Sequence, residues 1–505
     1  MKLPSLRLLG AALVAALAVS AALPPALVAP AHADDPAAPP SYDAVADLQN
    51  MTAAYGRIVG PGGQLQNPAY LPALVQQGTI VQTAQLLAQV ADPLRLSLTP
   101  AMAVPGWNVG NPLRASWAGT RGRQRKVAYT NRFGAKLAAT LYAPLPDARD
   151  PYTHQVLRAP YPAVVITPGS VGGSQGMYQW LAEDLAERGY LVLLFDVQGE
   201  GTSETLPHTS GQPFPFCNPF GAVAGDPALG TKEMSPCPGV PFQQLSNFTA
   251  GTVDTLDFLV STPSRPYRNP GAAGTRVDAF NPWWQLWDRR PLAHPTAPGR
   301  TSRIAIIGHS MGAAAVSYVQ AYDDRVATVV ALDKLSGGKG GVPTQQGPVV
   351  PKVPALALQS EYGFSVTPWQ LSGGSSLVPA AGNPDRMRER ATGFDLWRSR
   401  GVDSMLVVPR ASTHLEYTDI PLVLPASRWG QALSSVYVQR WLDAYLRGGP
   451  TAPLLADSFS YLEPRGHGVW QPVTLQRDPL LSGRYCSAYD FAGHVDTDWT
   501  DLGCP

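Results

Sequence analysis

A predicted buried strand leads directly into a tight glycine turn at residues 303–312, Arg-Ile-Ala-Ile-Ile-Gly-His-Ser-Met-Gly. The β-branched run predicts the strand, and the small residues after the turn favour a helix. Gly308 and Gly312 leave room for two backbone segments to approach closely. This is the sequence form of a nucleophile elbow, a junction that exposes the hydroxyl of Ser310. An incidental serine in a glycine-rich turn is the alternative.

The start of the chain has the pattern of a secretory signal peptide. Lys2 and Arg7 form a short basic region before an apolar run that fills residues 8–23. Ala-His-Ala at 31–33 then has the form of a cleavage site. We therefore expect cleavage after Ala33 and a secreted protein. An uncleaved anchor is the alternative, but two prolines interrupt the run, and we expect no stable membrane span.

The composition narrows the classes of partner. The formal net charge is +1 and only 15% of residues are charged, which argues against nucleic acid or acidic polymers. The hydrophobic share of 45% is enough for a large buried core.

Four cysteines fit an exported protein. Cys217 and Cys237 lie near each other in sequence, as do Cys486 and Cys504. Of the three possible pairings, the two local ones are expected, since each closes a short loop. Metal binding is the alternative, but no C-x-x-C motif or histidine cluster accompanies them, and no metal is expected.

The mature chain divides into a predicted helical segment, a main domain and a tail. The helical segment covers 34–125, the main domain 126–448 and the tail 449–505, which we expect to be irregular. Apolar strands alternate with helices in the main domain, which predicts an α/β fold with a mostly parallel central sheet covered by helices on both faces. Residues 202–300 form a long, lid-like insertion.

A serine nucleophile needs a base and an acid that orients it. His414 follows the last predicted strand, where a triad histidine belongs in such a sheet. Glu361 and Asp333 each follow a strand between Ser310 and His414. Glu361 is favoured as the acid because the later loop is the commoner position, and Asp333 is the alternative.

The developing oxyanion requires two preorganised donors. The backbone N–H of Met311 is one, and the loop after the first parallel strand supplies the other, from Ser170 or Val171. Aromatic residues of the insertion, Trp283, Trp284 and Phe216, are candidates for a substrate pocket. The alternative is that they fill a small satellite core.

The chain resembles the α/β-hydrolase superfamily and, within it, secreted actinobacterial esterases of the cutinase and dienelactone-hydrolase kind. The resemblance rests on Ala163–Ser170, Gly308–Gly312 and Thr413-His414. It implies Ser310 as nucleophile, His414 as base and backbone donors at Ser170 and Met311. The tail from Cys486 to Cys504 also resembles the terminal disulfide of bacterial cutinases. Those enzymes have an aromatic residue at the position of Ser170 and an aspartate near the position of Gly363, so polyester hydrolysis does not carry over.

The sequence therefore predicts a secreted serine hydrolase that cleaves carboxylic esters, with a small-molecule or lipid-like ester as substrate and no cofactor. A serine peptidase or amidase and an acyltransferase would use the same residues. A non-catalytic binding protein on the same fold is the alternative from another class, and it would need a degraded triad.

Overall fold

The computed structural model describes residues 42–91, 106–170, 173–204, 245–338, 348–423 and 425–505. The chain separates into two units, Met1–Pro39 and Pro40–Pro505, and all described residues belong to the second. The predicted signal peptide and its cleavage site lie outside the described residues.

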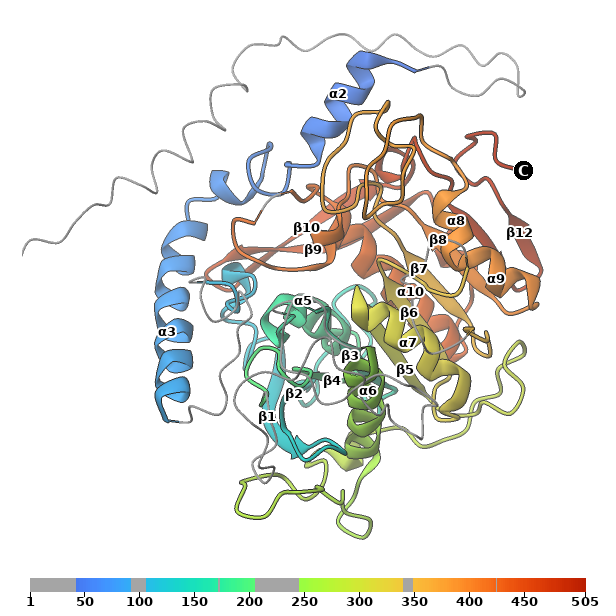
Figure 1. Cartoon of the computed structure of the whole chain (residues 1–505). Coiled ribbons are helices and arrows are strands. Elements are labelled where there is room, and N and C mark those ends of the chain that lie inside the picture. Colours follow the sequence, from blue (N-terminus) through green and yellow to red (C-terminus); the bar gives the residue numbers. More distant parts are fainter. Residues whose placement is uncertain (1–41, 92–105, 171–172, 205–244, 339–347, 424) are drawn as a thin grey trace, which may run out of the picture. The chain divides into compact units, whose positions relative to one another are not determined.

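A ten-stranded sheet organises the second unit, in the order β1-β2-β4-β3-β5-β6-β7-β8-β11-β12 (Figure 1). The six central strands from β4 to β8 are parallel, and an antiparallel pair flanks them on each side. The predicted α/β fold with a mostly parallel sheet is therefore confirmed. The strands are β1 (Gly122–Thr130), β2 (Lys136–Pro144), β3 (Ala163–Thr167), β4 (Leu191–Phe195), β5 (Ile304–His309), β6 (Thr328–Leu332), β7 (Ala355–Leu358), β8 (Ser404–Val407), β11 (Ala488–Phe491) and β12 (His494–Asp496).

Helices cover both faces of this sheet (Figure 1). Alternate residues of each central strand point to opposite faces, so β3 sends Val164 and Ile166 to the side of α5 and α10. Ala163 and Val165 point to the side of α6, α7 and α9. Because both faces are covered, the central strands are apolar throughout. The helices are α2 (Ala44–Ala53), α3 (Tyr70–Ala91), α5 (Gln175–Glu187), α6 (Leu245–Val260), α7 (Met311–Tyr322), α8 (Arg388–Thr392), α9 (Phe394–Ser399) and α10 (Gly430–Arg447).

The described part of the insertion does not form a lid. Its helix α6 is buried against β3 and β4 and lies in the layer that also contains α7, so it is a sheet-covering crossover helix between β4 and β5. Beyond α6 the chain returns to the start of β3, where Tyr161 N–H donates to Leu286 O at 2.6 Å. The first half of the insertion, residues 205–244, is outside the described residues.

The tail is more regular than its sequence indicates. Strands β9 (Ser458–Gly466) and β10 (Val469–Gln476) form a separate hairpin, and β11 and β12 extend the main sheet beyond β8. Short 3₁₀ turns connect these elements and others, namely η1 (Gln64–Gln66), η3 (Pro112–Arg114), η5 (Trp284–Leu286), η6 (His414–Tyr417), η7 (Ala452–Leu455) and η8 (Asp478–Leu480). The expectation of an irregular tail is wrong, because short alternating strands surrounded by turns give a weak signal.

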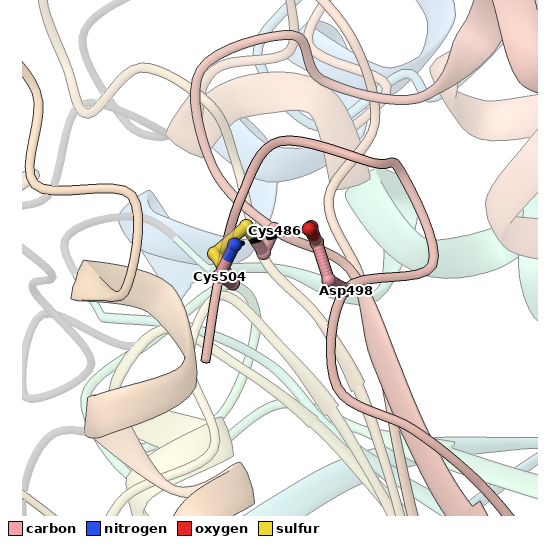
Figure 2. A group of neighbouring side chains, drawn as sticks. All are labelled: Cys486, Asp498 and Cys504. Atoms are coloured by element: carbon pink, nitrogen blue, oxygen red, sulfur yellow. Dashed lines mark hydrogen bonds between the residues drawn. A yellow bond between two sulfur atoms is a disulfide. The ribbon is translucent and has the colours of Figure 1, made fainter. Parts of the chain in front are cut away.

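The tail also contains a disulfide between Cys486 and Cys504, so this predicted pair is confirmed. Asp498 lies beside it (Figure 2). The Asp498 carboxylate accepts hydrogen bonds from the backbone N–H groups of Leu502, Gly503 and Cys504. The predicted pair Cys217 and Cys237 lies outside the described residues. In the described part of the chain, no helix combines the length and the apolar character needed to cross a bilayer.

Candidate active site

Ser310 lies at the junction between β5 and α7, at the carboxyl edge of the sheet. Its φ of 55° is unusual for a residue with a side chain, and its N–H donates to Leu332 O at 3.0 Å. Two glycines make the junction possible. A Cβ on Gly308 would lie 2.1 Å from Gly312 O, and one on Gly312 would lie 2.4 Å from Pro168 O. The close approach of strand and helix explains why the motif needs glycine at both positions.

His414 begins the 3₁₀ turn η6, after β8, and is buried beside Ser310. Its Nε2 lies 2.9 Å from Ser310 Oγ, and its Nδ1 lies 2.6 Å from Asp333 Oδ2. Its backbone N–H donates to Gly363 O at 3.1 Å. A carboxylate only accepts, so Nδ1 carries the proton and Nε2 is free to accept from the Ser310 hydroxyl.

Asp333 directly follows β6 and is almost completely buried. Its carboxylate also accepts from Ser360, at 3.2 Å from the backbone N–H and 2.8 Å from the hydroxyl. Burial opposes ionisation, but hydrogen bonding and the charge of His414, with the nearby ammonium of Lys334, hold the pKa of Asp333 well below its usual range. A carboxylate that stays ionised orients the imidazole and stabilises an imidazolium.

The structure corrects the favoured acid. The carboxylate of Glu361 faces away from His414: it accepts from Asn50 Nδ2, Ala411 N–H and Ser482 Oγ, each at 2.6 Å. It therefore joins α2, the loop after β8 and the tail. The alternative, Asp333, lies against His414. Both carboxylates follow neighbouring parallel strands, and the loop after β7 contributes Ser360, which donates to Asp333.

The loop after β3 passes directly beside the nucleophile. A Cβ on Gly169 would lie 3.0 Å from Ser310 Cβ. Ser170 follows in this loop, and Met311 opens helix α7, so both predicted donor residues adjoin Ser310 in the chain or in space. Val171 lies outside the described residues. The N-terminus of a helix beside the nucleophile also favours negative charge there.

A second histidine, His309, connects the parts that surround Ser310. Its Nε2 lies 3.0 Å from His414 O and its Nδ1 lies 2.7 Å from the hydroxyl of Tyr178. That hydroxyl accepts from Gly169 N–H at 3.0 Å. Burial lowers the pKa of His309 to about 3, assisted by the neighbouring charge of His414. A neutral His309 satisfies both of its contacts.

The predicted pocket aromatics do not meet Ser310. Trp283 and Trp284 adjoin the segment that pairs with Tyr161, just before β3 begins, whereas Ser310 follows the carboxyl end of β5. They lie at the opposite edge of the sheet, where Trp283 packs against the main core on the side of α6 and α7 and not in a separate satellite core. Phe216 is outside the described residues. The aromatic ring at the site is Phe364, whose centroid is 4.4 Å from that of His414.

Cys486, Asp498 and Cys504 form the group of potential metal ligands found among the described residues (Figure 2). The two cysteine sulfur atoms form a disulfide, and the Asp498 carboxylate accepts hydrogen bonds from backbone N–H groups. This group therefore provides no thiolate for a metal.

Tyr178, Ser360 and Phe364 are the site residues that the sequence did not indicate. Tyr178 is an ordinary core position of an amphipathic helix, and Ser360 is a polar residue in a strand-end loop. Phe364 carries a signal only in retrospect: it stands in a long stretch without charges, Tyr362–Pro384.

Comparison with known proteins adds little to the geometry. No family model matches the chain. A curated relative, an uncharacterized protein of Pseudomonas aeruginosa, is 30% identical over 138 residues, which are 26% of this chain and 35% of the relative. The chain thus aligns with about a third of that relative's length. The activity of the chain is therefore treated as a proposal.

Proposed function

We propose that this protein is a serine hydrolase of the α/β-hydrolase kind that cleaves carboxylic esters. The observation that carries the proposal is the hydrogen-bonded series Ser310–His414–Asp333, with the nucleophile at a strained strand–helix junction. The arrangement fulfils the geometric requirement for an activated serine: a nucleophile in contact with a base, and a base oriented by a buried acid.

The reaction proceeds in two halves. His414 Nε2 takes the Ser310 proton as Oγ attacks the ester carbonyl carbon, and the backbone N–H groups of Met311 and Ser170 stabilise the oxyanion. The tetrahedral intermediate collapses, the imidazolium gives its proton to the departing alcohol oxygen, and an acyl-enzyme forms on Ser310. Water, deprotonated by His414, then attacks the acyl carbon. Collapse releases the carboxylic acid and returns the proton to Ser310.

Beside His414, Phe364 and the loop that contains it offer a surface without formal charges. Phe364 packs against the His414 ring, and the loop Tyr362–Pro384 contains no Asp, Glu, Lys or Arg. This environment suits an uncharged alcohol or acyl group.

The test compares purified protein on p-nitrophenyl esters of increasing acyl length with p-nitroanilides of the same acyl groups. We expect ester turnover that is absent in Ser310→Ala. Faster turnover of the anilides would favour the amidase alternative, and turnover that survives Ser310→Ala would refute the mechanism. Export remains a prediction: protein recovered from the culture medium should begin at Asp34.

A further inference from the structure

Helix α3 exposes several apolar side chains to solvent, although Tyr70 at its start is buried. On the side that meets the rest of the chain, Gln77 Nε2 donates to Pro112 O at 2.9 Å, Gly78 faces Val109, and Gln85 is buried. The outward side carries six exposed aliphatic residues, between 45% and 80% accessible: Leu71, Val75, Ile80, Leu86, Leu87 and Val90. A helix that faces water normally exposes mainly polar side chains on that side.

This exposed face belongs to a long neutral stretch. No Asp, Glu, Lys or Arg occurs from Ile58 to Ala91, although 15% of the whole chain is charged. Another stretch without these residues is Tyr362–Pro384, which exposes Phe364, Leu371, Leu377 and Val378. Together these two stretches contain more than half of the exposed large apolar side chains of the described residues. We call the exposed apolar side chains of 58–91 and 362–384 the neutral surface.

The neutral surface reaches the candidate active site. Helix α2, which precedes the first stretch, is joined to the second because Asp47 Oδ2 accepts from Trp369 N–H at 3.0 Å. The ring of Tyr42 also lies 6.0 Å from that of Trp369. Near the start of the second stretch, the ring of Phe364 packs on His414, and the Phe364 side chain is still 54% exposed. A ligand bound at the Phe364 end of this surface is therefore next to His414.

We propose that the neutral surface docks the enzyme onto an electrically neutral, water-insoluble lipid surface that contains its ester substrate. The inference rests on the proposed function for the identity of the substrate. Anionic membranes are recognised by clusters of Lys and Arg, and protein partners by apolar centres with charged or polar rims. The two stretches contain no Lys, Arg, Asp or Glu, and exposed aliphatic residues enter a neutral lipid interface favourably.

Binding is tested with the Ser310→Ala protein, so that no hydrolysis occurs, by flotation with phosphatidylcholine vesicles. We expect the protein to float with the vesicles, and the triple variant Val75→Gln, Leu87→Gln, Val90→Gln to remain in solution. The matched control replaces three aliphatic residues exposed elsewhere, Val156, Val469 and Val495, with Gln and should float like the parent.

Three results would overturn the proposal: flotation that is unchanged by the α3 triple variant, binding that requires anionic lipid and disappears with salt, or a dimer in light scattering that the α3 variant abolishes. In the active protein, the α3 variant should lower the ratio of emulsified to soluble ester turnover. If Ser310 resists a fluorophosphonate, the proposed function fails, but vesicle binding by the neutral surface is judged separately.

A different observation carries a second proposal, on the buried pair Tyr178 and His309. The protons of this pair can be assigned from their partners. His414 O only accepts, so His309 Nε2 carries a proton and donates to it, and His309 Nδ1 must accept from the Tyr178 hydroxyl. Gly169 N–H completes the series by donating to Tyr178.

We infer that Tyr178 and His309 are positioning residues that hold the loop after β3 and the backbone of His414 in register around Ser310. Gly169 N–H is occupied by Tyr178, so the oxyanion donor of this loop is a later amide, Ser170 or the alternative Val171. We call the loop after β3 and the backbone of His414 the two arms of this series. A small displacement of either arm moves a reacting group relative to Ser310, and displacements of about 1 Å can lower a rate about 100-fold.

Three substitutions separate the two arms. His309→Gln keeps a donor toward His414 O, His309→Asn keeps an acceptor for Tyr178, and Tyr178→Phe removes a single oxygen. We expect kcat to fall about 10- to 100-fold with KM unchanged. Matched controls are Tyr129→Phe, which loses a buried 2.6 Å hydrogen bond to Thr255, and His294→Asn, which loses a 3.1 Å contact with Ser302 O.

The proposal is overturned if kcat falls no more in these variants than in the controls, or if only KM rises. Thermal melting of each variant identifies loss of fold, and Tyr178→Phe keeps the test decisive if both His309 variants unfold. The rate of fluorophosphonate labelling must fall in parallel with kcat, because a purely structural role leaves the labelling rate of folded protein unchanged.

Discussion

The carboxylate of Asp333 and the imidazole of His414 are joined by a 2.6 Å hydrogen bond, although the two residues follow different strands of the sheet. Two hydrogen bonds from Ser360 hold the carboxylate in place, and Lys334 beside it forms an ion pair with Glu389 at 2.6 Å. The acid is thus fixed on one side and oriented toward the base on the other.

Replacing Asp333 with Asn should lower kcat by about 10⁴-fold while the fold is retained, because the amide permits the wrong histidine tautomer; this magnitude is that of the corresponding change in a serine protease. Glu361→Gln should keep most of the activity, since Glu361 contacts no reacting group. Ester hydrolysis by the two variants decides between them. Activity retained by Asp333→Asn and lost by Glu361→Gln would restore Glu361 as the acid.

Gly312→Ala should destabilise the protein by about 1–3 kcal/mol or more, because the new Cβ collides with backbone oxygens of residues 167 and 168. Folded Gly312→Ala protein should also label more slowly with a fluorophosphonate, since the turn that presents Ser310 is displaced. Denaturant unfolding provides the measurement. The control is Gly483→Ala, where a Cβ would meet nothing within 4 Å. Equal stability of the two variants would contradict the packing of strand and helix described here.

His309 makes a specific contribution to the pH dependence of stability. Its pKa is about 3 in the folded protein against an ordinary value of 6.5, so the unfolded chain binds more protons between these values. The contribution is complete above about pH 6.5 and is lost as the pH falls toward about 3, at up to about 1.4 kcal/mol per pH unit. Urea unfolding from about pH 4 to about pH 7 should give a shallower slope for His309→Gln than for wild type. Identical slopes would refute the assignment.

The disulfide should stabilise the unit without contributing to the chemistry. Cys504→Ser is expected to cost about 2–4 kcal/mol of unfolding free energy, because the unfolded chain regains freedom in the loop that the bond closes. Asp498 keeps its contacts with the tail backbone, so labelling of Ser310 should persist below the lowered melting temperature. A melting temperature equal to that of wild type would show that the tail is held by other contacts alone.

The sequence was sufficient for the central sheet, and it indicated Ser310 and His414, which the structure brings together. The strands β3 to β8 are nearly continuous apolar runs, and their period and length do not depend on distant contacts. Ser310 and His414 are identified by local context, a strand–turn–helix motif and a position after the last parallel strand.

The acid could not be chosen from the sequence because Asp333 and Glu361 end neighbouring strands at the same edge of the sheet. Only the tertiary contacts of Glu361 with Asn50 and Ser482 exclude it, and these partners lie far away in the chain. Trp284 was expected near Ser310 for a similar reason. The chain between α6 and β5 crosses to the opposite edge of the sheet, and no local sequence pattern indicates that course.

The central claim is that Ser310 is an activated nucleophile, and the most direct measurement is intact-mass analysis after treatment with a fluorophosphonate, followed by peptide mapping. The account predicts stoichiometric modification of the wild-type protein at Ser310, none in Ser310→Ala, and much slower modification in His414→Ala and Asp333→Asn. Folded wild-type protein that remains unmodified, or a label that persists in Ser310→Ala, would contradict it.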